Sequence, residues 1–66
     1  MQIQLNGQPH PIDEPTSLAD LVDQLDLTGK RIAVEVNDEL VPRGEHADCQ
    51  LAEGDRVEIV QAIGGG

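Results

Sequence analysis

The residues best suited to chemistry are the last three of the chain, Gly64, Gly65 and Gly66. They directly follow the predicted last strand, without a polar spacer. A peptide without side chains is thin enough to thread a narrow slot and adopts positive φ angles freely. The α-carboxylate of Gly66 is ionised at neutral pH and is a poor electrophile. It must therefore be activated before it reacts, and we expect an acyl-adenylate made from ATP.

The sequence shows no machinery for that activation. It contains no phosphate-binding loop, no paired base and nucleophile, and no cluster of metal ligands. We therefore expect another protein to bind the ATP and its magnesium, and this chain to be acted on rather than to act as an enzyme. The alternative is a protein-interaction domain in which the three glycines are an unreactive terminal extension.

Cys49 is the single cysteine, and His46 stands three residues before it. One helical turn would bring the two side chains together, and a neighbouring histidine can lower the pKa of a thiol. A single cysteine is more often a small apolar filler, so we expect a packing role for Cys49, with sulfur carriage as the alternative. We expect His10 and His46 at the surface, and Arg43 either to cap a turn or to meet a partner.

Composition narrows the classes of partner. The 66 residues include 4 Lys plus Arg and 13 Asp plus Glu, for a formal net charge of −9. Nucleic acids and anionic membranes both require clustered basic side chains, so neither is expected as a partner. No apolar run approaches the roughly 20 residues of a membrane span, and the N-terminus lacks a signal segment, which predicts a cytoplasmic protein. We expect the acidic surface to keep the protein soluble, with steering toward basic partners as the alternative.

Periodicity predicts the elements that must position the terminus. A period of two over residues 1–5 predicts a strand with one buried face, and Asn6-Gly7 is a strong hairpin signal. The return strand over residues 8–13 contains Pro9 and Pro11, which cannot donate to a ladder. We therefore place that strand at the edge of the sheet.

A helix is predicted over residues 18–27. Ser17 followed by Asp20 has the spacing of a capping box, and Gly29 is expected to end the helix. Its apolar face recurs at helical spacing and consists of Leu18, Leu21, Val22 and Leu25.

Three further strands are predicted. Residues 32–36 alternate, residues 39–41 form a short strand before Pro42, and residues 56–63 form the last strand. The intervening residues 43–49 have room for one helical turn. This order predicts a two-layer α+β domain with a mixed sheet of four to five strands and one main helix packed across one face.

The last strand also suggests a docking surface. If Val57 and Ile59 face the core, Val60 and Ala62 lie on the sheet face away from the helix, near Ala33. A small exposed apolar patch beside the terminus suits transient docking, so we expect Val60 and Ala62 to contact partners. The alternative is that a neighbouring strand half covers Val60.

Several stretches, spanning nearly the whole chain, resemble the thiamine-biosynthesis sulfur carrier proteins, which belong to the ubiquitin-like β-grasp sulfur carriers ending in Gly-Gly. The resembling residues are 17–22, 32–37, Leu40-Val-Pro-Arg43, Leu51-Ala-Glu-Gly-Asp-Arg-Val-Glu-Ile59 and Ala62-Ile-Gly-Gly-Gly66. The resemblance implies a ubiquitin-like β-grasp domain over residues 1–63 and a flexible glycine tail over residues 64–66.

The resemblance also implies a chemistry and a set of partners. Gly66 would be adenylated by an E1-like adenylyltransferase using Mg-ATP and converted to a thiocarboxylate, 1-thioglycine, with sulfur from a cysteine-desulfurase persulfide. Thiazole synthase would then take that sulfur for the thiazole ring of thiamine. Gly64 and Gly65 would thread the partner, and the chain itself would bind no cofactor or metal.

Two other readings share the same terminal chemistry. The small subunit of molybdopterin synthase differs in its acceptor enzyme, and a ubiquitin-type modifier would be joined to lysines. Molybdopterin-synthase small subunits are commonly longer and usually carry aromatic residues near the sheet, whereas this chain has no Phe, Tyr or Trp.

Overall fold

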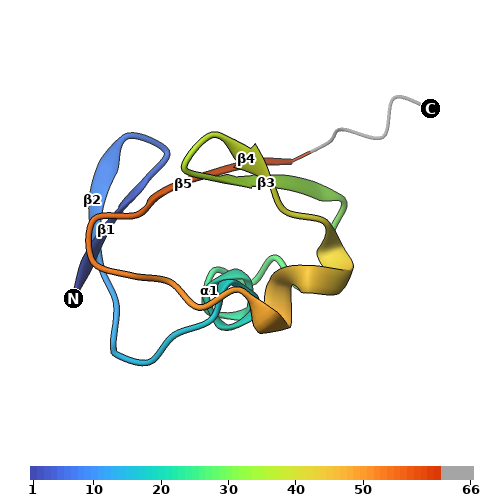
Figure 1. The fold of residues 1–66 in the computed structure, drawn as a ribbon. Coiled ribbons are helices and arrows are strands. Elements are labelled where there is room, and N and C mark those ends of the chain that lie inside the picture. Colours follow the sequence, from blue (N-terminus) through green and yellow to red (C-terminus); the bar gives the residue numbers. More distant parts are fainter. Residues whose placement is uncertain (62–66) are drawn as a thin grey trace.

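The computed structural model describes residues 1–61, in which one five-stranded sheet carries one α-helix across one face (Figure 1). The elements in chain order are β1 (Gln2–Leu5), β2 (Gln8–Pro11), α1 (Leu18–Gln24), β3 (Ile32–Val36), β4 (Glu39–Leu40), the 3-10 helix η1 (Arg43–Asp48) and β5 (Arg56–Gln61). The strand order is β2-β1-β5-β3-β4. β1 and β5 are parallel and the other neighbours are antiparallel, so the predicted two-layer α+β fold with a mixed sheet is confirmed.

Both hairpins turn through two residues with positive φ. These residues are Asn6 and Gly7, at φ 49° and 80°, and Asn37 and Asp38, at φ 52° and 70°. Positive φ at both central positions is the signature of a type I′ turn, whose twist matches that of the flanking strands. The turn at Asn6-Gly7, which the sequence predicts, therefore sets the register of β1 with β2, and the turn at Asn37-Asp38 sets that of β3 with β4.

Strand β2 lies at the edge of the sheet, as its two prolines predict. It ends at Pro11, two residues before the predicted end, although Ile12 just beyond it is buried in the core. His10 is half-buried and not at the surface as predicted. The reason is its register: it lies opposite Ile3, whose side chain faces the core.

Helix α1 begins with the predicted capping box. The backbone N–H of Asp20 donates to Ser17 Oγ at 3.0 Å, and the backbone N–H of Ser17 donates to Asp20 Oδ2 at 3.1 Å. An aspartate therefore satisfies the box as well as the more common glutamate would.

The predicted end of the helix is wrong. Helix α1 ends at Gln24, and Asp26 at φ 60° takes the left-handed position that we expected of Gly29. The N–H of Leu27 donates to the carbonyl of Val22 and the N–H of Asp26 to that of Asp23, both at 3.0 Å. These two bonds form a Schellman motif, in which a non-glycine residue is uncommon.

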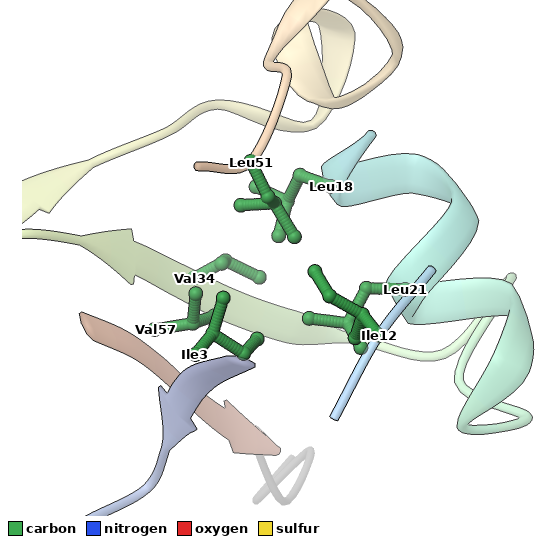
Figure 2. Close-up of a cluster of buried hydrophobic side chains, with 7 residues drawn as sticks. All are labelled: Ile3, Ile12, Leu18, Leu21, Val34, Leu51 and Val57. Atoms are coloured by element: carbon green, nitrogen blue, oxygen red, sulfur yellow. The ribbon is translucent and has the colours of Figure 1, made fainter. Parts of the chain in front are cut away.

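The core lies between the sheet and α1 (Figure 2). Figure 2 shows seven buried aliphatic side chains pointing toward one another: Ile3, Ile12, Leu18, Leu21, Val34, Leu51 and Val57. Each contributes on the order of 1.5–3 kcal/mol of burial free energy. Because Val57 sits in this cluster, the core fixes which face of β5 points inward.

The segment between β4 and β5 is tied to the start of the helix. The N–H of Leu18 donates to the carbonyl of Cys49 at 2.7 Å, and the N–H of Leu51 donates to that of Thr16 at 3.0 Å. The predicted helical turn in this segment is η1. No helix among residues 1–61 is long and apolar enough to cross a membrane.

Candidate functional site

The candidate site is the end of β5 and the sheet surface around it. Four residues with predicted roles, Ala62, Gly64, Gly65 and Gly66, lie outside the described residues, as does the predicted boundary after residue 63. The described chain leads up to them at Gln61, which pairs with Ile32 of β3. The described part of the site therefore consists of the elements that hold β5 and the faces of the sheet beside it.

The side chain of Asn6 takes the place of a strand beside β5. Strand β1 ends at Leu5, and its ladder with β5 reaches only Val57. Beyond that point, Asn6 Oδ1 accepts from the N–H of Ile59 at 2.8 Å and Asn6 Nδ2 donates to the Ile59 carbonyl at 3.3 Å. The amide thus reproduces the hydrogen bonds of a peptide group and continues the sheet along β5.

The second hairpin turn holds the start of β5 in a similar way. Asn37 Oδ1 accepts from the N–H of Arg56 at 2.9 Å, and the N–H of Asn37 donates to the Arg56 carbonyl at 2.7 Å. Its Nδ2 donates to Asp55 Oδ1 at 3.0 Å. β5 is therefore fixed by two asparagines, one from each type I′ turn, on opposite sides of the strand.

Val60 lies on the face of the sheet that points away from α1, hereafter the outer face. It is directly opposite Ala33 of β3, as the sequence predicts, and it is 62% exposed. No neighbouring strand covers it, so the alternative reading of a half-covered Val60 is wrong. Its docking role stays a prediction.

Leu40 is the exposed apolar residue that sequence reasoning missed. It is 66% exposed on the edge strand β4 and lies opposite Glu35 on the outer face. The signal was available, because a two-residue turn at Asn37-Asp38 places residue 40 opposite residue 35. We call Ala33, Leu40 and Val60 the outer-face patch.

Charged side chains adjoin this patch. Glu35 lies directly opposite Glu58, and both are exposed. Arg56, on the same face as Glu58, turns toward the β3–β4 turn, where its Nη2 lies 3.2 Å from Asp38 Oδ2. The outer face therefore combines exposed apolar residues with two adjacent carboxylates.

His46 and Cys49 do not form a reactive pair. His46 is only 7% exposed, contrary to prediction, because it is held inside the fold by a 3.0 Å hydrogen bond between its Nε2 and the Val41 carbonyl. Burial, and then the charges of Asp55 and Glu45, raise the pKa of the Cys49 thiol. Cys49 packs against the core, which confirms the predicted packing role.

A groove of about 410 Å³ runs between α1, the loop after it and η1. Its polar groups serve local structure: Asp20 caps the helix, Asp23 Oδ1 accepts from Thr28 Oγ1 at 3.2 Å, and Arg43 Nη2 donates to the Lys30 carbonyl. Arg43 therefore holds a turn, one of its two predicted roles. Among residues 1–61, no three His, Cys, Asp or Glu side chains are placed to hold a metal ion.

Comparison with protein families gives one match over almost the whole chain. A model described as the ThiS family matches residues 3–66. The sulfur carrier protein ThiS of Escherichia coli (strain K12) is 32% identical over 66 residues, covering all of both chains. The thiazole synthase of Magnetococcus marinus is 41% identical over 66 residues, and the chain covers 20% of that protein.

A solved structure shows the same fold. The crystal structure of the thiamine biosynthesis protein ThiS from Geobacter metallireducens has a TM-score of 0.85 and 29% sequence identity, with both chains covered completely. This likeness, together with the strand order and the helix across one face, confirms the ubiquitin-like β-grasp fold.

Proposed function

The chain belongs to the ThiS family of thiamine-biosynthesis sulfur carriers, and on that premise we propose that it carries sulfur as a thiocarboxylate on Gly66. The observation that carries the proposal is the reach of the family match, which extends to residue 66 and so includes all three terminal glycines. In the proposed chemistry, the α-carboxylate of Gly66 is the only reacting group that this chain contributes.

The proposed chemistry has three steps. A Gly66 carboxylate oxygen first attacks the α-phosphorus of ATP and releases pyrophosphate, which gives the acyl-adenylate. The terminal sulfur of a persulfide then displaces AMP from the acyl carbon, and a second thiol cleaves the S–S bond to leave the thiocarboxylate. An adenylate supplies the good leaving group that a free carboxylate lacks.

Under this proposal the chain is a co-substrate and not an enzyme. An E1-like adenylyltransferase binds the ATP and magnesium, and a cysteine desulfurase supplies the persulfide. Gly64 and Gly65 form the slender segment that reaches into the partner's active site. The raised pKa of Cys49 supports this assignment, because it argues against a thiolate of the chain's own as the sulfur carrier.

Thiazole synthase is the acceptor that we propose. In Magnetococcus marinus, a protein named thiazole synthase contains a segment 41% identical to this whole chain. A second thiazole synthase, from Paramagnetospirillum magneticum, matches over the same 66 residues at 33% identity. Carrier-like and synthase sequences joined in one polypeptide support a direct working relationship between the two, and we extend that relationship to this chain.

Docking is proposed to use the outer face. Val60 and Ala62 are the residues proposed to contact the partner, and the exposure of Val60 and Leu40 supports this use of the face. Helix α1 covers one side of the sheet (Figure 1), and the strand pairing places Leu40 and Val60 on the other side. A partner could therefore bind there without disturbing the core.

Intact mass spectrometry tests the proposal. The protein is incubated with ATP, a cysteine desulfurase, cysteine and an E1-like adenylyltransferase. We expect a mass gain equal to replacement of one oxygen by sulfur, and no gain after deletion of Gly66. An unchanged mass would contradict the proposal.

Two further observations distinguish the alternatives. Conjugation of the chain to other proteins would favour a ubiquitin-type modifier. Copurification with thiazole synthase, or with the large subunit of molybdopterin synthase, identifies the acceptor.

A further inference from the structure

The outer face keeps two carboxylates side by side at a cost to the fold. Glu35 on β3 and Glu58 on β5 are directly opposite in the antiparallel ladder, and both are exposed. Directly opposite residues have Cβ atoms about 4.5–5.5 Å apart, and like charges at that separation are destabilising. The pair therefore works against the free protein.

Among the described residues, neither of these glutamates forms an ion pair. Among residues 1–61, the one ion pair joins Arg56 to Asp38, although Arg56 stands only two residues from Glu58 on the same face. Arg43 is used by the Lys30 carbonyl, and residues 62–66 contain no basic side chain. Glu35 and Glu58 therefore have no ion-pair partner within residues 1–61, and the basic side chain of a bound protein could supply one.

The surroundings of the pair favour a protein surface as the source. Leu40 lies opposite Glu35 in the same row of the sheet, and Val60 lies two residues beyond Glu58 on the same face. These are the two large apolar side chains exposed among residues 1–61. Apolar contacts that exclude water around a charged contact are the arrangement in which such a contact contributes most to binding.

We propose that the protein that activates Gly66 inserts a basic side chain between Glu35 and Glu58 while its apolar surface covers Leu40 and Val60. The inference rests on the proposed function and specifies the chemistry of that partner. An arginine suits the position better than a lysine, because its planar fork of five donors can bridge two carboxylates. The two glutamates thus lower the stability of the free protein, and in the complex their charges are complementary to the basic side chain of the partner.

Opposite effects on folding and binding distinguish this role from a structural one. The variants are Glu35→Gln and Glu58→Gln, with Glu14→Gln as the control. Glu14 is an exposed residue in the loop between β2 and α1, and its replacement changes the net charge by the same amount. The partner is an E1-like adenylyltransferase chosen because it adenylates the wild-type chain at Gly66. Melting temperature, association rate and dissociation rate are measured for each variant.

We expect Glu58→Gln and Glu35→Gln each to raise the melting temperature by roughly 1–4 °C. We expect each to speed dissociation by about tenfold, because loss of a buried charge contact acts mainly on the dissociation rate. Glu14→Gln should change neither quantity and should alter only the association rate.

An unchanged dissociation rate in Glu35→Gln and Glu58→Gln, or one changed equally in Glu14→Gln, would overturn the inference while leaving the carrier function in place. A lower melting temperature in Glu58→Gln would also overturn it, because the carboxylate would then be stabilising the fold. If no E1-like adenylyltransferase modifies Gly66 of the wild type, the proposed function itself fails and the inference fails with it.

Discussion

Val60 is a large apolar side chain that the protein leaves 62% exposed, six residues before its terminal glycine. Val57, which points inward three residues earlier on β5, is 1% exposed in the core. Val60 therefore contributes much less burial free energy to the fold than Val57 does. Its replacement tests a surface role without opening a cavity. The nearby Leu40 and Ala33 extend the same exposed area across β3 and β4.

We expect Val60→Asp to weaken binding to the adenylyltransferase while leaving the fold intact. The change removes an apolar contact and places a charged group against the apolar partner surface expected there, so the dissociation constant should rise by roughly tenfold or more. The cost to folding should stay within about 1 kcal/mol, because the β-propensity scale spans only that much. Calorimetric titration and thermal unfolding measure the two effects.

Two companion variants separate the causes of that loss. Val60→Thr keeps the branched shape and adds no charge, so it should weaken binding less than the aspartate. Gln24→Glu adds one negative charge on an exposed residue of α1 and should leave binding nearly unchanged. Wild-type affinity in Val60→Asp would refute the docking role of Val60.

At the scale of elements, β5 is the strand that positions the terminus, and side chains from two turns hold it in place. Asn37 binds the backbone of Arg56 at the start of the strand, and Asn6 binds that of Ile59 near its end. Both asparagines have positive φ, which their short polar side chains tolerate. Each asparagine therefore forms part of its own hairpin turn and also stabilises β5.

We expect Asn6→Gly to free the end of β5. Glycine keeps the left-handed turn but removes the two hydrogen bonds to Ile59, so the protein should lose on the order of 1–2 kcal/mol of stability. The backbone N–H of Ile59 should exchange with solvent faster than in the wild type. Hydrogen exchange followed by NMR measures this for each amide.

Asn37→Gly is the matched control, because it alters the same kind of turn at the other end of β5. It should speed exchange at the Arg56 amide and leave the Ile59 amide protected. Equal protection of Ile59 in wild type and Asn6→Gly would show that the Asn6 side chain does not hold the strand.

Elements fixed by local chemistry could be predicted from the sequence. The capping box of Ser17 and Asp20 and the turn at Asn6-Gly7 depend on neighbours in the chain, and both are present. The end of α1 was mispredicted because Asp26 takes a conformation that usually favours glycine. His46 was predicted at the surface because its burial depends on a hydrogen bond to the Val41 carbonyl, which no local sequence pattern indicates.

At the scale of the whole molecule, basic residues are few and acidic residues are many. Lys30 and Arg31 precede β3, and Arg43 is bonded to the Lys30 carbonyl. Arg56 is paired with Asp38. With 13 acidic against 4 basic residues, most carboxylates are uncompensated, so a negative potential extends from much of the surface.

Steering, the alternative role of the acidic surface, predicts that association with the activating enzyme slows as salt is added. The Debye length falls from about 30 Å at 0.01 M to about 8 Å at 0.15 M ionic strength, which screens long-range attraction to a basic partner. The association rate should drop by roughly tenfold across that range. Stopped-flow fluorescence measures the rate, with labelled enzyme and unlabelled carrier.

The same experiment separates steering from contact. Glu14→Gln and Glu58→Gln each remove one charge, so both should reduce the salt dependence of association to a similar small extent. Only Glu58→Gln should change the dissociation rate, because only its side chain is expected to touch the partner. A rate independent of salt in the wild type would mean that the acidic surface serves solubility alone, and the long-range field would then have no part in recognition.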